Sequence, residues 1–254
     1  MKIHRLFLSS ALMMILSGCT FSTSIDSLLS PPTLSDEQAQ IYQALTDKVG
    51  TKVSLKYPKS GSYLSAFVIA DIDEEPTDEA IVFYERNGIT ADEISLRINI
   101  LDKRNDKWSS VYDSPANGTE VEKVIISKIG SSPLTNIIVG YNMSQGDKNV
   151  SVYNYSDGIL NQNYSDSYST VDVCDIDNDG LSELIVITGN SASGTAEAKL
   201  LKLDENGQYS KYRTSMSENA IEYSQYLYSD NSEGTKTIIA VSYTHLRAHE
   251  TGRN

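Results

Sequence analysis

The chain has 254 residues, with 21 Lys or Arg against 34 Asp or Glu and a net charge of −13 at pH 7. Phosphate backbones would repel so acidic a chain, which excludes nucleic acid as an expected partner and leaves cations, proteins and neutral glycans. The three histidines, His4, His245 and His249, lie close to the two ends. The body between them therefore excludes histidine-dependent catalysis and His-ligated zinc.

The chain begins with the pattern of an export signal. Two basic residues precede an apolar stretch over residues 6–16, which is much shorter than the ~20 residues of a membrane-spanning helix. The stretch runs into Leu16-Ser17-Gly18-Cys19, which resembles the lipobox of bacterial lipoproteins. The resemblance implies removal of residues 1–18, lipidation of Cys19, and a lipid anchor on the extracytoplasmic face of the cell membrane. An ordinary secretory signal is the alternative.

A tether and a single helix are expected next. Residues 19–34 are rich in Ser and Thr and contain Pro31-Pro32, a composition typical of a flexible linker. Ser35 followed by Gln38 has the pattern of a capping box, and apolar residues then recur at helical spacing until Gly50. The sequence therefore predicts a helix over 35–50.

The remainder of the body, residues 51–241, has the pattern of β-structure. Apolar and polar residues alternate, most clearly over 94–100, and turn pairs such as Asp157-Gly158 and Asn206-Gly207 separate the apolar runs. Patterns of strand, polar turn and strand span residues 96–111, 150–164 and 198–212. The sequence therefore predicts an all-β fold behind one N-terminal helix.

An acidic stretch at Asp175–Val186 recurs along this β region. The copy at Asp71–Val82 matches it at the acidic positions, at a buried Ile and at the start of an apolar strand. A third copy at Lys128–Val139 has lost the acids, and a fainter fourth copy starts at Tyr228. A unit of roughly 50 residues with about four short strands has the size of a propeller blade.

The motif shared by these copies resembles the FG-GAP and VCBS repeats of calcium-binding, integrin-like β-propellers. The resemblance covers most of residues 53–241 and implies four β-propeller-like repeats, the last of them truncated. A propeller hides its sheet edges by closing a ring, so a truncated last repeat predicts an incomplete ring. A β-sandwich with acidic turns is the alternative fold.

The best copy has the ligand pattern of a calcium loop. Carboxylates at alternate positions can converge on one cation, and a glycine permits a sharp turn between them. The predicted calcium ligands are Asp175, Asp177, Asp179, Glu183 and the carbonyl of Leu181. An EF-hand is excluded because its twelfth position would be Val186, and a dockerin-type loop would lead into a helix. A metal-free turn rich in Asp and Asn is the alternative.

The copy at Asp71 is the poorer site. Its predicted calcium ligands are Asp71, Asp73, Glu75 and Glu79. Pro76 replaces the glycine and cannot adopt a positive φ, and Glu75 has a longer side chain than the Asp it replaces. We therefore expect a solvated acidic turn at this copy, with calcium as the alternative, and no metal at the third and fourth copies.

These features predict a membrane-anchored, extracytoplasmic lipoprotein whose calcium-stabilised scaffold binds a protein or a glycan and has no enzymatic activity. The alternatives are a carboxylate-dependent, glycan-active enzyme with its site in further blades, and an accessory subunit of an envelope assembly. Residues 242–254 resemble read-through of adapter or vector sequence and are expected to be non-native, with a genuine polar tail as the alternative.

Overall fold

The computed structural model describes residues 34–87, 96–190, 195–217, 225–230 and 236–241. One helix, α3 (Asp36–Val49), opens this part of the chain, close to the predicted bounds. Acidic residues in its first turn and Lys48 in its last turn complement the helix dipole. Gly50, at φ 91°, ends the helix by donating its N–H to the Thr46 carbonyl at 2.9 Å. Within the described residues, no helix is long and apolar enough to cross a membrane.

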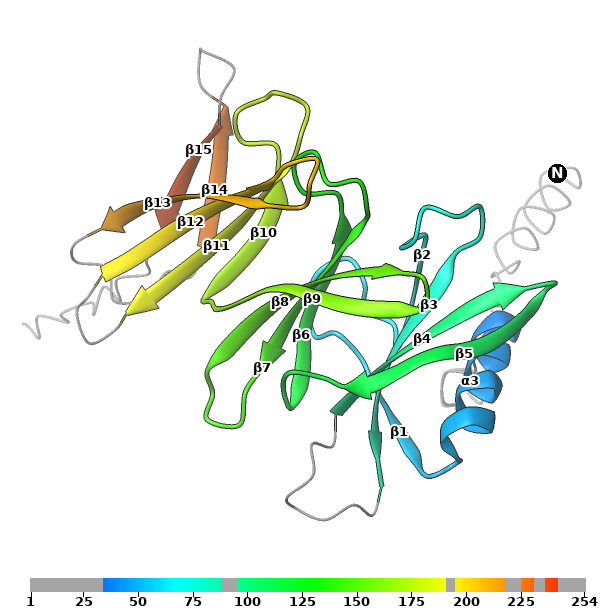
Figure 1. Ribbon diagram of the computed structural model, residues 1–254. Coiled ribbons are helices and arrows are strands. Elements are labelled where there is room, and N and C mark those ends of the chain that lie inside the picture. Colours follow the sequence, from blue (N-terminus) through cyan, green and yellow to red (C-terminus); the bar gives the residue numbers. More distant parts are fainter. Residues whose placement is uncertain (1–33, 88–95, 191–194, 218–224, 231–235, 242–254) are drawn as a thin grey trace, which may run out of the picture. The chain divides into compact units, whose positions relative to one another are not determined.

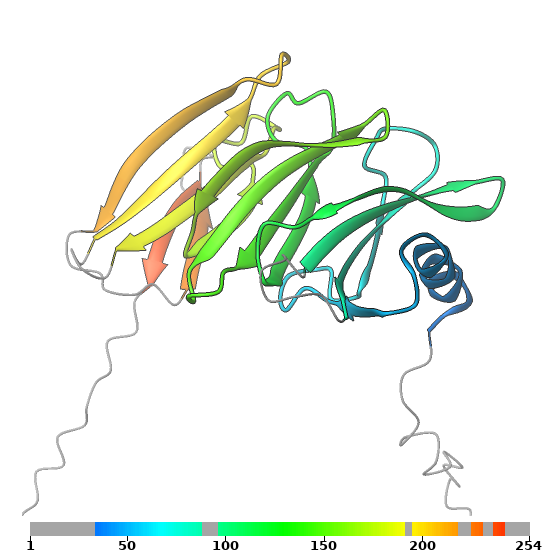
Figure 2. The same ribbon diagram turned by 60° about the horizontal axis from the view of Figure 1, so that its bottom comes forward.

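Three antiparallel meanders follow one another along the chain (Figures 1 and 2). The first sheet contains β1 (Val53–Lys56), β2 (Phe67–Ala70), β3 (Glu79–Arg86), β4 (Leu96–Arg104) and β5 (Lys107–Pro115). The second contains β6 (Glu120–Ser127), β7 (Asn136–Asn142), β8 (Lys148–Ser156) and β9 (Ile159–Ser167). The third contains β10 (Thr170–Cys174), β11 (Glu183–Asn190), β12 (Thr195–Leu203) and β13 (Tyr209–Ser217). A last hairpin pairs β14 (Gln225–Asp230) with β15 (Lys236–Val241).

The local sequence explains the outer hairpin of each meander. Both residues of each turn pair have a positive φ: Asn105 at 51° and Asp106 at 59°, and Asp157 at 53° and Gly158 at 78°. Such two-residue turns match the twist of the strands they join, so β4 returns as β5 and β8 as β9. These hairpins agree with the patterns of strand, turn and strand in the sequence.

The sheets pack on one another through alternate side chains of the same strand. Ile137 and Val139 of β7 lie in a buried cluster with Phe83 and Ile98 of the first sheet. Ile138, between them, lies in a second cluster with residues of the third sheet. Successive side chains of a strand point to opposite faces, so both faces of the second sheet are buried. Each such aliphatic side chain contributes about 1.5–3 kcal/mol of burial free energy.

Helix α3 packs on the other face of the first sheet. Its Ile41 and Leu45 are fully buried in a cluster with Val82, Tyr84 and Trp108. The apolar stripe that predicted the helix is therefore the surface that covers the sheet.

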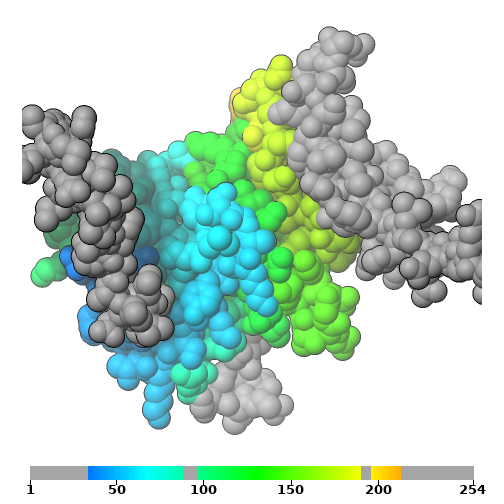
Figure 3. Space-filling view, turned by 180° about the vertical axis from the view of Figure 1, so that it is seen from behind, coloured from blue at the N-terminus to red at the C-terminus, as the bar shows by residue number. Residues whose placement is uncertain are grey.

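The segment between β1 and β2 ties the first repeat to the second. The backbone N–H groups of Lys59 and Ser60 donate to the Glu122 carbonyl at 3.0 and 2.8 Å, and Ser60 forms a parallel bridge with Lys123. In the space-filling view of Figure 3, the cyan surface of the first repeat borders the green surface of the second. Main-chain hydrogen bonds therefore add to the apolar contact between these repeats.

The prediction of an all-β fold with one helix is confirmed, and sheets of five, four and four strands follow one another in the described residues. The described residues form no closed ring. The fourth copy begins later than the sequence indicated, because β14 extends to Asp230 and so contains Tyr228. Its loop therefore falls between β14 and β15, over residues 231–235, outside the described residues.

Candidate functional site

A loop of the same length occurs at the same place in each of the three sheets. It joins β2 to β3 over residues 71–78, β6 to β7 over 128–135, and β10 to β11 over 175–182. We call the first the Asp71 loop and the last the Asp175 loop. The residue that follows each loop is buried, and its side-chain oxygen accepts a hydrogen bond from the backbone N–H seven residues earlier. These pairs are Glu79 with Ile72 at 3.0 Å, Asn136 with Ile129 at 2.9 Å, and Glu183 with Ile176 at 2.9 Å.

In the Asp175 loop, backbone hydrogen bonds aim the carboxylates at one point. Carboxylate oxygens of Asp175, Asp177 and Glu183 lie within 4.8 Å of one another. Asp175 accepts hydrogen bonds from the N–H groups of Asp179, at 3.2 Å, and Gly180, at 2.9 Å. Gly180 has φ 86°, in the left-handed region that favours glycine, as the turn requires.

The two other predicted ligands of the Asp175 loop lie outside this group of three. Leu181 donates its N–H to an Asp179 carboxylate oxygen at 2.9 Å. The other Asp179 oxygen contacts the ammonium of Lys202, which lowers the pKa of Asp179. The structure therefore brings together three of the four predicted carboxylates and turns the fourth toward a lysine.

Lys202 of β12 is a residue that the sequence analysis missed. Its Nζ lies 3.0 Å from Glu183 Oε1 and 3.5 Å from Asp177 Oδ2, in addition to its contact with Asp179. These carboxylates raise the pKa of Lys202, so it stays charged. The β11–β12 register pairs Leu184 with Leu201 and so sets Lys202 opposite Glu183. Only this strand pairing could have revealed the contact, because the loop and the lysine are separate in the sequence.

The Asp175 loop fits a hard cation. Glu183 is 2 % exposed and its Oε1 accepts no hydrogen bond, although Lys202 lies beside it. A buried carboxylate oxygen without a hydrogen bond needs a positive partner. Three converging carboxylates supply the oxygen ligands that calcium prefers.

The Asp71 loop builds a similar group from its own acids. Carboxylate oxygens of Asp71, Asp73 and Glu79 lie within 4.8 Å of one another. Glu75 is outside this group, is exposed, and donates its N–H to Asp73 at 3.1 Å. Glu74 has a positive φ of 68°, as its counterpart Asn178 has at 59°, while Pro76 stands where the other loop has Gly180 at φ 86°.

The electrostatics of the two loops differ. Burial, together with the nearby Asp73, Asp102 and Asp71, raises the pKa of Glu79 to about 7. Burial also raises the pKa of Asp73. The β3–β4 register pairs Ala80 with Leu101 and so sets Asp102 opposite Glu79. Within the described part of the chain, no lysine or arginine pairs with the Glu79 carboxylate.

The loop of the second sheet is acid-free and serves as a contact between repeats. Gly130 donates its N–H to the Ser182 carbonyl at 2.7 Å, and Ser131 donates to the Leu203 carbonyl at 2.8 Å. A Cβ on Gly130 would lie 2.3 Å from the Leu203 oxygen, so this close approach requires glycine. Glu74 of the Asp71 loop in turn accepts from Lys128 at 2.8 Å. The first two loops therefore each contact the next repeat.

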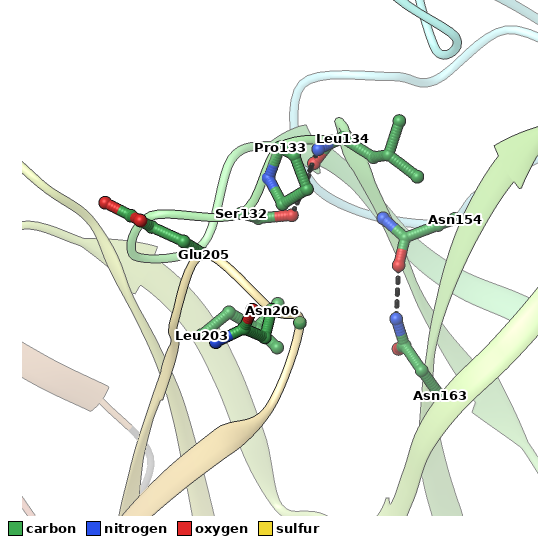
Figure 4. Close-up of a pocket in the computed structure, with 9 residues that line it drawn as sticks. Ser132, Pro133, Leu134, Asn154, Asn163, Leu203, Glu205 and Asn206 are labelled. Carbon is green, nitrogen blue, oxygen red and sulfur yellow. Dashed lines mark hydrogen bonds between the residues drawn. The ribbon is translucent and has the colours of Figure 1, made fainter.

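A cavity of about 230 Å³ lies beside this second loop (Figure 4). Its lining mixes four neutral polar side chains with apolar residues, one glycine and one glutamate: Ser132, Pro133, Leu134, Asn154, Asn163, Leu203, Glu205, Asn206 and Gly207. In Figure 4 the side chains of Asn154 and Asn163 are hydrogen-bonded to each other, and Asn163 also accepts from the Tyr209 hydroxyl at 3.0 Å. Fixed amides beside a tyrosine can recognise a polar, uncharged ligand.

Comparison with known proteins identifies no family. No family model matches the chain, and no curated protein matches it. Two solved structures are similar at a low level: the rhamnogalacturonan lyase YesW, with a TM-score of 0.35, and a rhamnogalacturonan lyase of Bacillus licheniformis, also with 0.35. Their sequence identities are 13 % and 10 %, over 76 % and 70 % of this chain. The chain spans about half of each, 50 % and 46 %, and similarity this low supports no conclusion about activity.

Proposed function

We propose that this protein is an exported lipoprotein, anchored to the membrane through Cys19, whose propeller-like repeats of the FG-GAP or VCBS type are stabilised by calcium and bind a protein or a glycan. One observation carries the calcium part of the proposal. At the same place in two repeats, three carboxylates converge, and one of them belongs to a buried glutamate. Clustering carboxylates without a cation is costly, because like charges repel and burial favours the neutral acid.

Calcium would act here as a structural ligand. Asp175, Asp177 and Glu183 would hold it in the third repeat, and Asp71, Asp73 and Glu79 in the first. Each set joins a loop to the first residue of the next strand, so a bound cation would fix the loop on the sheet. Because calcium would bind the folded state and not the unfolded one, it would stabilise the fold by mass action.

Calcium titration of the melting temperature tests this role. Millimolar calcium, added after treatment with a chelator, should raise the melting temperature by several degrees. Asp73→Ala and Asp177→Ala should each reduce the rise, and the double variant should show none. Magnesium at the same ionic strength controls for screening. A wild-type chain that does not respond to calcium would overturn this part of the proposal.

The membrane anchor has its own test. Cys19 lies outside the described residues, and its proposed lipidation rests on the sequence motif alone. Cys19→Ser should move the protein from the membrane fraction to the soluble fraction when it is expressed in a bacterium. Retention of this variant in washed membranes would contradict the anchor.

The cavity in Figure 4 is the place where we propose that the ligand binds. Retention of a particular oligosaccharide on a glycan array would favour a glycan, and Asn206→Ala, at the exposed rim of the cavity, should weaken it. A stoichiometric partner captured from envelope extract would favour the accessory-subunit alternative. Cleavage of a retained glycan would favour the enzyme alternative.

A further inference from the structure

The three repeats differ at one strand position whose side chain can compete with, or attract, a bound cation. It is the residue of the next strand that lies opposite the buried residue after each loop. In the first repeat Asp102 lies opposite Glu79, in the second Asn154 lies opposite Asn136, and in the third Lys202 lies opposite Glu183. The same backbone position therefore carries an acid, an amide and a base.

In the third repeat, the ammonium of Lys202 lies among the carboxylates that would hold a metal ion. Its Nζ is 3.0 Å from the buried Oε1 of Glu183 and 3.5 Å from Asp177, and it contacts Asp179. Lys202 approaches from the side, since it stands on β12 and the loop precedes β11. Three of the four acids of this loop are therefore ion-paired within the protein.

In the first repeat, the basic side chain on the facing strand, Arg104, pairs with Asp102 and not with the buried glutamate. Asp102 is 8 % exposed and pairs with Arg104 at 2.6 Å, while 76 % of the Arg104 side chain is exposed. The described contacts of Arg104 do not include Glu79. The two repeats thus have comparable acid content, but only the third places a positive charge against its buried glutamate.

We propose that Lys202 is an internal cation that competes with calcium for the Asp175 loop. This inference rests on the proposed calcium sites and adds how one of them is controlled. To bind with all its ligands, calcium must displace the ammonium from Glu183, Asp177 and Asp179. The displaced ammonium would then lie close to a divalent cation. The loss of its ion pairs and its repulsion of calcium both lower the affinity of the loop for calcium.

This competition reverses the order of calcium affinity that the loop sequences indicated, in which the Asp175 loop was the better site. The Asp175 loop has the better ligand spacing and the glycine, yet it carries its own counter-ion. The Asp71 loop has Pro76 and lacks such a counter-ion at Glu79, so it fills at the lower calcium concentration. The Asp175 loop also keeps its shape without calcium, because Lys202 already places a positive charge beside its buried carboxylate.

Calcium titration calorimetry on the full chain, with one loop disabled, tests the competition. Asp73→Ala removes a ligand from the Asp71 loop and leaves the Asp175 loop as the site under test. Adding Lys202→Met removes the ammonium but keeps much of the apolar stem. We expect this double variant to bind calcium at roughly tenfold lower concentration than Asp73→Ala alone. Further addition of Asp177→Ala should remove the gain.

Two controls separate competition from general charge effects. Lys211→Met makes the same change of charge on β13, where Lys211 lies 3.9 Å from Asp166 and makes no described contact with the loop. It should leave the calcium affinity of Asp73→Ala unchanged. Lys202→Arg keeps the charge and should keep the low affinity. Circular dichroism in chelator shows whether each variant is folded.

The outcomes distinguish this inference from the proposed function. Equal affinity with and without Lys202 would overturn the competition while the calcium role stands. The wild-type chain could also bind calcium while neither Asp73→Ala nor the double variant with Lys202→Met does. That result would overturn the competition too. A wild-type chain that binds no calcium would overturn the proposed function and this inference together.

Discussion

The Asp71 loop and the Asp175 loop share a backbone plan and differ in electrostatics. Each connects two paired antiparallel strands, and each is followed by a buried glutamate that accepts a hydrogen bond from the backbone N–H seven positions earlier. In one, the glutamate faces Asp102 and its pKa rises to about 7. In the other, it lies 3.0 Å from Lys202. The loop sequence thus supplies the ligands, while a residue on the neighbouring strand determines whether a metal ion is needed to neutralise them.

Removing each buried glutamate should give the largest difference between the loops. Glu183→Ala leaves the Ile176 N–H without its acceptor and leaves Lys202 without its buried partner. We expect a loss of about 3–4 kcal/mol in the free energy of unfolding, measured by urea denaturation in chelator. Glu79→Ala also removes an acceptor, from Ile72, but it relieves repulsion among acids and should cost about half as much or less. Equal losses at the two positions would remove the distinction between the loops.

The pH dependence of stability should sharpen the comparison. Glu79 has a folded pKa of about 7 against 4.5 for an unperturbed glutamate, so the folded state holds its proton more tightly. The free energy of unfolding should therefore fall as pH rises from about 4.5 to about 7, by roughly 2–3 kcal/mol from this group.

The matched variants for this pH profile are Glu79→Gln and Glu183→Gln. Glu79→Gln keeps an acceptor for Ile72 and should flatten the decline, with higher stability than the wild type at pH 8 in chelator. Glu183→Gln should lower stability at pH 8, because it removes the charge that faces Lys202. A wild-type profile that rises over this pH range would contradict the role of Glu79.

The smallest effect is expected from the residue that the sequence singled out as a defect. Pro76 lies outside the carboxylate group, and the positive φ of its loop falls on Glu74. Pro76→Gly should therefore change the melting temperature in chelator by no more than a few degrees, downward, because glycine adds freedom to the unfolded chain. It should also leave the calcium midpoint of the Asp71 loop nearly unchanged. A large gain in calcium affinity would show that the proline, and not the facing strand, limits this loop.

The sequence alone predicted most of the local structure of this protein. The start of the helix after Ser35, the hairpin turn at Asp157 and the recurring acidic loops each depend on residues close together in the chain, and each occurs where it was expected. The roles of Asp175, Asp177, Asp71 and Asp73 in converging groups were predicted in the same way. Glu75 and Asp179, predicted as ligands in the same way, lie outside these groups, because spacing does not show which way a side chain in a turn points.

Only the tertiary structure decided what faces each loop. Lys202 and Asp102 stand on strands whose side chains reach the loops through antiparallel pairing, and register is a property of the sheet that no local pattern encodes. The use of Gly130 as a contact with the third sheet was also settled by packing, because its neighbours at Leu203 are distant in the sequence. Local sequence therefore determined where the loops lie, and strand register determined the charge that each buried carboxylate meets.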